Sequence, residues 1–317
     1  MANPDISVIV LTYNADLNDL KKTLRSIMLQ KGVSYEIVIA DDGSSDNLSD
    51  EISAFFKTSG FEDYVLALNP ENHGTVINVI SGVEKASGRY VKLISPGDYL
   101  YDEDSLRKLF DCAVKNDAPL VFGDILIFDS NAEEFTVIKK WAYPQIVKCY
   151  SEDCYDPEAV RLNNLVVADN IHGVSTLIER VVLLKHLKMI EGKVIYCEDL
   201  SYRLMAYEGV KMIRCPYPIV MYGYGEGIST SGKWEERLRN DTRAANELML
   251  SMPCSDEKFK ELMRQAFEER FSGDRKKMKA FFAKHPDLLL KKLKMERSPR
   301  YTATEYNEAF VSQILGA

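Results

Sequence analysis

Short apolar runs and amphipathic segments alternate along the first hundred residues of the chain. Continuous apolar runs predict buried strands at 6–11, 36–40, 64–68 and 90–94. Apolar residues at helical spacing predict helices between them, at 17–30, about 47–57 and 76–86. We expect the last of these helices to stop at Gly88. This alternation indicates right-handed βαβ units and a parallel sheet, so the loops that follow the strands should share one edge.

The pattern changes in the second part of the chain. It continues with a helix at 106–116 and a strand at 120–129, and loosens between about 130 and 175. Further helices are predicted at 180–187, 243–252, 257–271, 278–284 and 304–315. We therefore predict an α/β domain over residues 1–230, followed by a helical C-terminal region over 231–317.

The composition favours a globular protein and argues against several other classes. Of 317 residues, 46% are hydrophobic and 28% charged, which is the balance of a soluble globular protein. No apolar run is long enough for a transmembrane helix, and the N-terminus does not resemble a secretory signal. Six scattered cysteines argue against a zinc site or a disulfide framework and favour the cytoplasm. A net charge of −8 argues against nonspecific binding of nucleic acid.

One segment of this acidic chain is strongly basic. Ten lysine and arginine residues lie between Arg275 and Arg300, interleaved with phenylalanine and leucine. Such a segment could rest on an anionic membrane surface, which would make the protein peripheral at the inner face of the membrane. More often such a segment is the solvated face of ordinary packed helices.

An acidic turn follows the second predicted strand. Asp41 and Asp42 come directly after the apolar run and precede Gly43 and Ser44. Open α/β sheets bind ligands at the carboxyl ends of their strands. Two carboxylates there suit a base, a ribose hydroxyl or a metal ion rather than phosphate. The alternative is a polar turn that caps the next helix.

The two opening blocks resemble family 2 glycosyltransferases, which have the GT-A fold. The blocks are Ile6-Ser7-Val8-Ile9-Val10-Leu11-Thr12-Tyr13-Asn14 and Glu36 to Asp46. Asn72-x-Gly74, Gly82 and Ala86-x-Gly88 match the next block of that family. Glu198-Asp199, followed by Arg203-Leu204, resembles its catalytic acidic pair. The resemblance covers about residues 5 to 230.

The resemblance implies transfer of a sugar from a nucleotide-sugar donor, with inversion. We expect a UDP-sugar donor and, as acceptor, a growing surface glycan or lipid-linked saccharide. Asp199, with Glu198 beside it, would take the proton from the acceptor hydroxyl. Mn²⁺ or Mg²⁺ would neutralise the diphosphate. The expected donor-binding residues are Thr12, Tyr13, Asn14, Asp41, Asp42, Gly74, Asp98 and Lys233.

The chain departs from the family pattern at the diphosphate end of the site. Ser95-Pro96-Gly97-Asp98 stands where the family has Asp-x-Asp-Asp, which leaves Asp98 as the expected metal ligand. Asn78-Val79-Ile80 replaces a segment that carries a phosphate-binding arginine. His73, Lys92 or the segment 229–234, with Lys233, could substitute. That segment could be a lid over the phosphates or a plain linker.

The acceptor side and the oligomeric state are less defined. His172, Trp141, Tyr143 and Tyr155 could contact a sugar, or could be ordinary structural residues. A noncatalytic module that binds sugar nucleotide or glycan remains an alternative, because the Asp-x-Asp motif is degraded. The helical C-terminal region could also pair two subunits in a homodimer.

Overall fold

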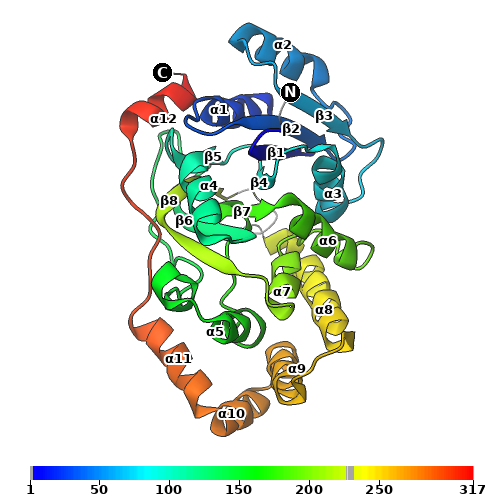
Figure 1. Ribbon diagram of the computed structural model, residues 1–317, viewed down its shortest axis with the longest axis vertical. Coiled ribbons are helices and arrows are strands. Elements are labelled where there is room, and N and C mark those ends of the chain that lie inside the picture. The colour runs from blue at the N-terminus through cyan, green and yellow to red at the C-terminus, as the bar shows by residue number, and fades with distance from the viewer. Residues whose placement is uncertain (1–2, 226, 228–231, 317) are drawn as a thin grey trace.

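An eight-stranded mixed sheet forms the centre of the computed structural model, which describes residues 3–225, 227 and 232–316 (Figure 1). The strand order is β3-β2-β1-β4-β7-β6-β8-β5. The strands are β1 Ile6–Thr12, β2 Tyr35–Asp41, β3 Tyr64–Leu68, β4 Tyr90–Ile94, β5 Tyr99–Leu100, β6 Leu120–Asp129, β7 Thr176–Glu179 and β8 Met212–Tyr224.

The first four strands are parallel, as predicted. β1 lies between β2 and β4, so that Val8 pairs with both Ile37 and Lys92. Helices cover both faces of this half of the sheet (Figure 1), which explains why the strands read as continuous apolar runs. The loops after the four strands therefore reach the same edge.

The second half of the sheet was only partly predicted. β7 pairs antiparallel with both β4 and β6, which makes the sheet mixed. This strand is too short to show a pattern, because it has four residues and leads directly into a helix. β8 is long but contains Pro216 and Pro218, and its register with β6 shifts at Asp124. Prolines within a segment argue against a strand when only the sequence is considered. For this reason β8 was not predicted.

The predicted helices are present, with shifted ends. Helix α3 ends at Lys85 with Ala86 as its C-cap, so the expectation that Gly88 stops this helix was wrong. Gly88 instead contacts β1, where its N–H donates to Ser7 Oγ at 2.8 Å. A Cβ at Gly88 would lie 2.5 Å from the Ser7 nitrogen, so this close approach requires glycine. The helices before residue 210 are α1 Leu17–Met28, α2 Ser49–Ser59, α3 Thr75–Lys85, α4 Ser105–Asn116, α5 Pro157–Leu162, α6 Arg180–Ile190 and α7 Leu200–Tyr207.

The C-terminal helices descend from the sheet, and the chain then returns to it (Figure 1). Ala245, Met249 and Met263 belong to the same buried cluster as Ile9 and Val38 of the sheet. After the last basic helix an extended segment runs back, and α12 packs beside α1. The helices are α8 Glu235–Ser251, α9 Glu257–Ser272, α10 Arg275–Lys284, α11 Pro286–Arg297 and α12 Glu308–Leu315. The division at 230/231 stays a prediction, and both residues lie outside the described ones.

The basic segment forms α10 and α11. Phe281 and Leu288 are buried against Val166 and Ala266, so part of its apolar face is ordinary core. Arg300 does not join the basic face, because its Nη2 pairs with Asp124 Oδ1 at 2.7 Å. Over the described ranges, none of the helices combines the length and apolar character needed to cross a membrane.

Candidate active site

Asp41 ties the loops after β1 and β2 together. Its carboxylate accepts a hydrogen bond from Thr12 Oγ1 at 2.8 Å, and others from the Ser44 nitrogen at 2.8 Å and Oγ at 2.6 Å. Only 2% of Asp41 is exposed. A polar turn is therefore present, but it does not cap the next helix, because α2 begins at Ser49 with Leu48 as its N-cap and without a side-chain capping bond. Each carboxylate oxygen can accept more than one hydrogen bond, so the contact of Asp41 with a base stays a prediction.

Asp42 holds the next loop of the same edge. Its two oxygens accept the backbone N–H groups of His73 at 3.0 Å and Gly74 at 2.8 Å. These donors immediately precede helix α3. Asp42 thus orders the segment that leads from β3 into α3, and its predicted contact with a base remains a prediction.

Tyr13 and Asn14 complete the predicted base-binding edge. Asn14 adopts φ +46°, and its Oδ1 accepts from both the nitrogen and the Oγ of Ser45 at 3.2 Å. Tyr13 is 53% exposed, although a tyrosine usually buries most of its ring. An exposed ring beside two ordered acidic residues suits an aromatic wall for a nucleobase.

Gly74 brings this edge against the loop that carries the acidic pair. Gly74 has φ +91°, and a Cβ there would lie 2.4 Å from Ile195 Cγ2. The Val76 N–H also donates to the Ile195 carbonyl at 3.0 Å. The structure therefore places the Asp42 loop directly beside the loop of Glu198 and Asp199, about 155 residues later in the sequence.

Glu198 and Asp199 lie between α6 and α7. Asp199 is the N-cap residue of α7, but its carboxylate makes no capping hydrogen bond. A carboxylate at the start of a helix is also favoured by the helix dipole, so a purely structural role for the pair stays open beside the catalytic one. Burial raises the pKa of both carboxyls. The Asp199 charge raises that of Glu198 further, and the Arg203 charge partly lowers that of Asp199. A raised pKa suits a general base that works near neutral pH.

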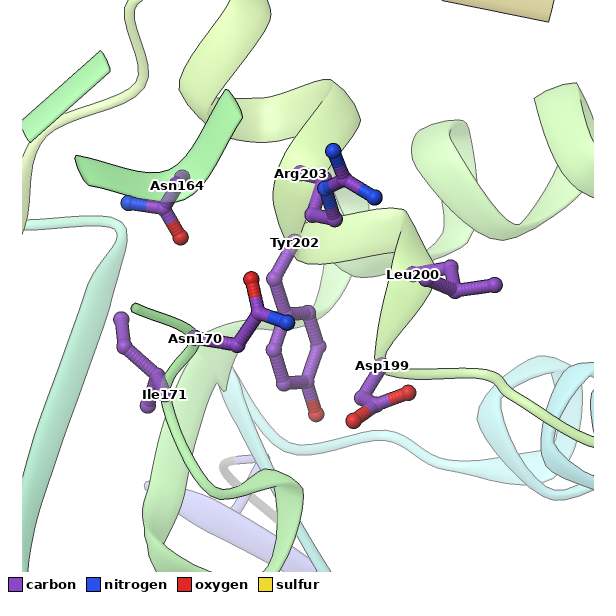
Figure 2. Close-up of a pocket in the computed structure, with 7 residues that line it drawn as sticks. All are labelled: Asn164, Asn170, Ile171, Asp199, Leu200, Tyr202 and Arg203. Carbon is purple, nitrogen blue, oxygen red and sulfur yellow. The ribbon is translucent and has the colours of Figure 1, made fainter. Parts of the chain in front are cut away.

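A small cavity borders Asp199 (Figure 2). Its volume is about 10 Å³, which is roughly the space of one water molecule. In Figure 2 the Tyr202 hydroxyl lies beside the Asp199 carboxylate, while the Arg203 guanidinium points away from it. A Cβ at Gly173 would come 3.4 Å from Asp199 Cβ and 3.5 Å from Glu198 Oε1. The cavity is lined by Asn164, Asn170, Ile171, Asp199, Leu200, Tyr202 and Arg203.

Asp98 is buried between β4 and β5. Its Oδ1 accepts the Gly223 N–H at 2.9 Å, and its carbonyl accepts from Thr23 Oγ1 at 2.9 Å. Burial raises the pKa of Asp98 to about 7, although the Gly223 N–H and the Lys92 charge oppose this rise. Asp98 therefore has a structural role besides the predicted one.

The proposed substitutes for the missing arginine differ in their access to ligands. Lys92 is wholly buried and donates to the carbonyls of Leu93 and Val174, so the suggestion that it binds the diphosphate was wrong. The side chain of His73 is 43% exposed and remains available. Lys233 is exposed in a short 3₁₀ turn, Gly232–Trp234. Residues 229–231 of the predicted lid lie outside the described residues.

The four residues that were predicted to contact the acceptor differ in burial. Burial lowers the pKa of His172 to about 4, so its imidazole is neutral, and its buried Nε2 has no hydrogen-bond partner. Its ring meets the half-exposed ring of Tyr143 edge to face at 5.8 Å. Trp141 is 40% exposed, whereas Tyr155 packs against the core. His172, Tyr143 and Trp141 therefore remain candidates for contact with a sugar.

The described residues do not fit a resident metal site. Among them, no three His, Cys, Asp or Glu side chains gather in a way that could hold an ion. Proteins commonly bind Mg²⁺ through one or two carboxylates, with water and substrate phosphates completing its six ligands, and the candidate carboxylate here is Asp98, whose Oδ1 is already in a hydrogen bond. We therefore derive no step through a metal ion.

The family follows from the sequence comparison. The model of "Glycosyl transferase family 2" matches residues 7–182, which is more than half of the chain. The chain belongs to glycosyl transferase family 2. The match includes both loops of the predicted base-binding edge and ends before Glu198.

Curated members of family 2 share parts of this chain. Glycosyltransferase GlyA of Streptococcus pneumoniae is 31% identical over 43% of this chain, and the match spans 19% of GlyA. The glucosyltransferase WfgD of Escherichia coli, named as acting from UDP-Glc on α-D-GlcNAc-diphosphoundecaprenol, is 22% identical over 74% of this chain and 83% of its own. Pneumococcal GlyG is matched over 42% of its length, so this chain spans less than half of these two pneumococcal relatives.

Solved structures show the same fold. S. aureus TarS with UDP-GlcNAc aligns with a TM-score of 0.57 at 17% identity, over 86% of this chain and 74% of that one. The Pyrobaculum calidifontis mannosyltransferase PcManGT, with GDP-Man and Mn²⁺, aligns with a TM-score of 0.59 at 16% identity, over 94% and 76%. The predicted GT-A fold is confirmed.

One buried carboxylate beside the candidate site was missed. Asp241 of α8 accepts hydrogen bonds from three consecutive N–H groups just before Glu198. The helix predicted at 243–252 begins eight residues after the observed start of α8 at Glu235, so the prediction left Asp241 outside it. An aspartate among arginine and asparagine gives no pattern that marks it as buried.

Proposed function

We propose that this chain transfers a sugar from a UDP-sugar to a hydroxyl of a surface glycan or lipid-linked saccharide, with inversion. One observation carries the proposal, namely the 3.0 Å hydrogen bond between the Val76 nitrogen and the Ile195 carbonyl. It holds the loop ordered by Asp42 against the loop of Glu198 and Asp199. A nucleotide and an acidic base can thus meet at one edge of the sheet.

The chemistry follows from the positions of these residues. Asp199 accepts the proton of the acceptor hydroxyl while the hydroxyl oxygen attacks the anomeric carbon of the donor sugar. The bond from that carbon to the diphosphate breaks, and UDP leaves with the electron pair. Attack from the side opposite to the leaving group inverts the anomeric centre. Burial raises the pKa of Asp199 and so keeps this base from being too weak, although the Arg203 charge opposes the rise.

Relatives support the choice of donor and acceptor. The name of WfgD gives a UDP-linked donor and a diphosphoundecaprenol-linked acceptor, and TarS was crystallised with UDP-GlcNAc. PcManGT was crystallised with GDP-Man, so a guanosine donor is the rival to test. A lipid-linked acceptor would bring the protein to the cytoplasmic face of a membrane. Exposed lysines of α10 and α11, with Leu290 67% exposed, suit such a surface.

Nucleotide release tests the proposal. The purified chain is incubated with UDP-Glc, UDP-GlcNAc, UDP-Gal or GDP-Man and a diphosphoundecaprenol-linked sugar, with Mn²⁺, Mg²⁺ or EDTA. We expect UDP release that depends on acceptor, together with a glycosylated lipid by mass spectrometry. UDP binding without turnover of any donor would favour the noncatalytic module. The observation that favours this alternative is that residues 95–98 contain a single carboxylate.

Asp199→Asn is the decisive variant for the base. Removing a general base costs about 10²- to 10⁴-fold in rate. We expect kcat to fall by about that factor while UDP affinity, measured by calorimetry, stays within about threefold. Near-normal transfer by Asp199→Asn would show that another group is the base.

A further inference from the structure

The segment before the acidic pair is held by one side chain of the C-terminal region. Asp241 Oδ1 accepts the Ile195 N–H at 3.1 Å, and its Oδ2 accepts those of Tyr196 at 2.7 Å and Cys197 at 3.0 Å. Only 5% of Asp241 is exposed. A carboxylate that receives three N–H groups fixes the direction of the backbone that donates them.

This part of the chain has no regular structure of its own. Helix α6 ends at Ile190 and α7 begins at Leu200. The amides of residues 191, 193 and 194 still bond to carbonyls of α6, whereas those of 195–197 bond to the Asp241 carboxylate. Buried N–H groups without partners are costly, and Asp241 supplies partners for three in succession. The next two residues are Glu198 and Asp199, so the loop enters the acidic pair in a direction set by Asp241.

The same helix also holds the other side of the pair. Arg203, in the first turn of α7, donates from Nη2 to Asn246 Oδ1 at 3.0 Å. Both side chains are almost fully buried, and Asn246 Nδ2 donates back to the Thr242 carbonyl at 2.6 Å. α8 lies alongside α7 in Figure 1, so contacts from α8 flank the acidic pair before and after it.

α8 is itself firmly anchored. Ala245 and Met249 are fully buried in the main core cluster with residues of the sheet and of α3. A side chain on such a helix is more rigidly placed than one on a loop. The position of Asp199 relative to the nucleotide edge therefore depends on a helix outside the matched family segment, 7–182.

We propose that Asp241 is a positioning residue for transfer, which orients Glu198 and Asp199 through the backbone of residues 195–197. The inference rests on the proposed function for the role of that pair. A misplacement of about 1 Å can cost about 10²-fold in rate. Loss of the Asp241 carboxylate should therefore lower kcat, while the binding edge at Asp41 and Asp42 stays intact.

The test compares Asp241→Ala and Asp241→Asn with a matched control in the same helical region. Asp256→Ala removes a carboxylate that caps α9 by accepting the Phe259 N–H at 2.9 Å, far along the chain from the acidic pair. We expect kcat to fall about 10²-fold in Asp241→Ala and less in Asp241→Asn, which keeps one acceptor oxygen. The donor KM should change by less than about threefold in both. Asp256→Ala should keep the wild-type kcat.

Hydrogen exchange gives a readout that does not need activity. In Asp241→Ala, amides in a peptide covering residues 194–200 should exchange at least about tenfold faster, while peptides at 6–12 and 35–41 keep their protection. Unchanged exchange or unchanged kcat in folded Asp241→Ala would overturn the proposal. An equal loss of kcat in Asp256→Ala would show a general effect of stability. If the wild-type chain transfers no sugar, the proposed function fails, and the exchange result still decides whether Asp241 holds the loop.

Discussion

The carboxylate of Asp98 accepts the backbone N–H of Gly223 at 2.9 Å. This bond joins the turn after β4 to the end of β8, from which the chain continues toward Lys233. The expected metal ligand therefore also fixes the last part of a strand. Removal of the Asp98 side chain would break the hydrogen bond to Gly223 and would also remove the expected metal ligand. Two different substitutions are needed to separate these effects.

Asp98→Asn and Asp98→Ala should differ in stability but agree in donor binding if Asp98 binds the metal. Asparagine retains an oxygen that can accept the Gly223 N–H, whereas alanine does not. If a metal ion binds only together with the diphosphate and takes Asp98 as its protein ligand, Mn²⁺-dependent UDP affinity should fall in both variants, because a neutral side chain is a poor ligand for a hard cation. The free energy of unfolding should fall by about 1–3 kcal/mol in Asp98→Ala alone. Calorimetry with and without EDTA measures the first effect, and denaturant titration the second. Normal metal-dependent affinity in both variants would remove Asp98 from the metal site.

The stability difference between wild type and Asp98→Asn should depend on pH. Burial raises the pKa of Asp98 in the folded protein to about 7, above its ordinary value. Below that ordinary value both states hold the proton, and burial of the neutral carboxyl carries no penalty from charge. As pH rises, the unfolded chain releases the proton first, so the wild type loses stability until the folded Asp98 also ionises near pH 7. Asp98→Asn should gain stability relative to the wild type between about pH 4 and pH 7. A difference that stays constant over this range would contradict the raised pKa.

The pH profile of turnover should respond to Arg203. Burial raises the pKa of Asp199, and the Arg203 charge opposes that rise. A base works only when ionised, so kcat should fall as pH decreases through this raised pKa. Arg203→Met keeps much of the side-chain volume but removes the charge, which should move the acidic limb of kcat to higher pH. Arg214→Met, which breaks an ion pair with Asp124, is the matched control and should leave the limb in place. An unshifted limb in Arg203→Met would exclude Asp199 as the titrating base.

Gly74→Ala should disturb the contact between the two loops of the site. A Cβ at Gly74 would lie 2.4 Å from Ile195 Cγ2 and 2.8 Å from the Ile195 carbonyl oxygen, and φ is +91°. We expect kcat to fall about 10²-fold, because the loop of Glu198 and Asp199 must move. Gly192→Ala has a similar backbone strain, with φ +72° and nothing within 4 Å of the added Cβ. It should lose stability by about 1 kcal/mol and keep most of its activity. Equal losses of kcat in the two variants would show that strain, rather than the contact, matters.

Local signals were sufficient for the first half of the fold. The four parallel strands are continuous apolar runs because helices cover both faces, and that pattern is visible in the sequence. The acidic turn at Asp41 and Asp42 lies at the predicted strand end, and the residues around it carried the resemblance to family 2. The elements that were not predicted are β5, β7, β8, α5, α7 and α11. β7 is short, β8 contains prolines, and Pro286 at the start of α11 follows α10 after a single residue.

The sequence by itself determined the family, the α/β alternation and the identity of the acidic motifs, because each of these depends on residues close together in the chain. Only the tertiary structure decided how the motifs meet. The Gly74 contact with Ile195, the Lys92 hydrogen bond to the Val174 carbonyl and the three hydrogen bonds to Asp241 join residues far apart in sequence. Such contacts depend on how the helices pack on the sheet, and packing leaves no periodic signal in the residues that it brings together.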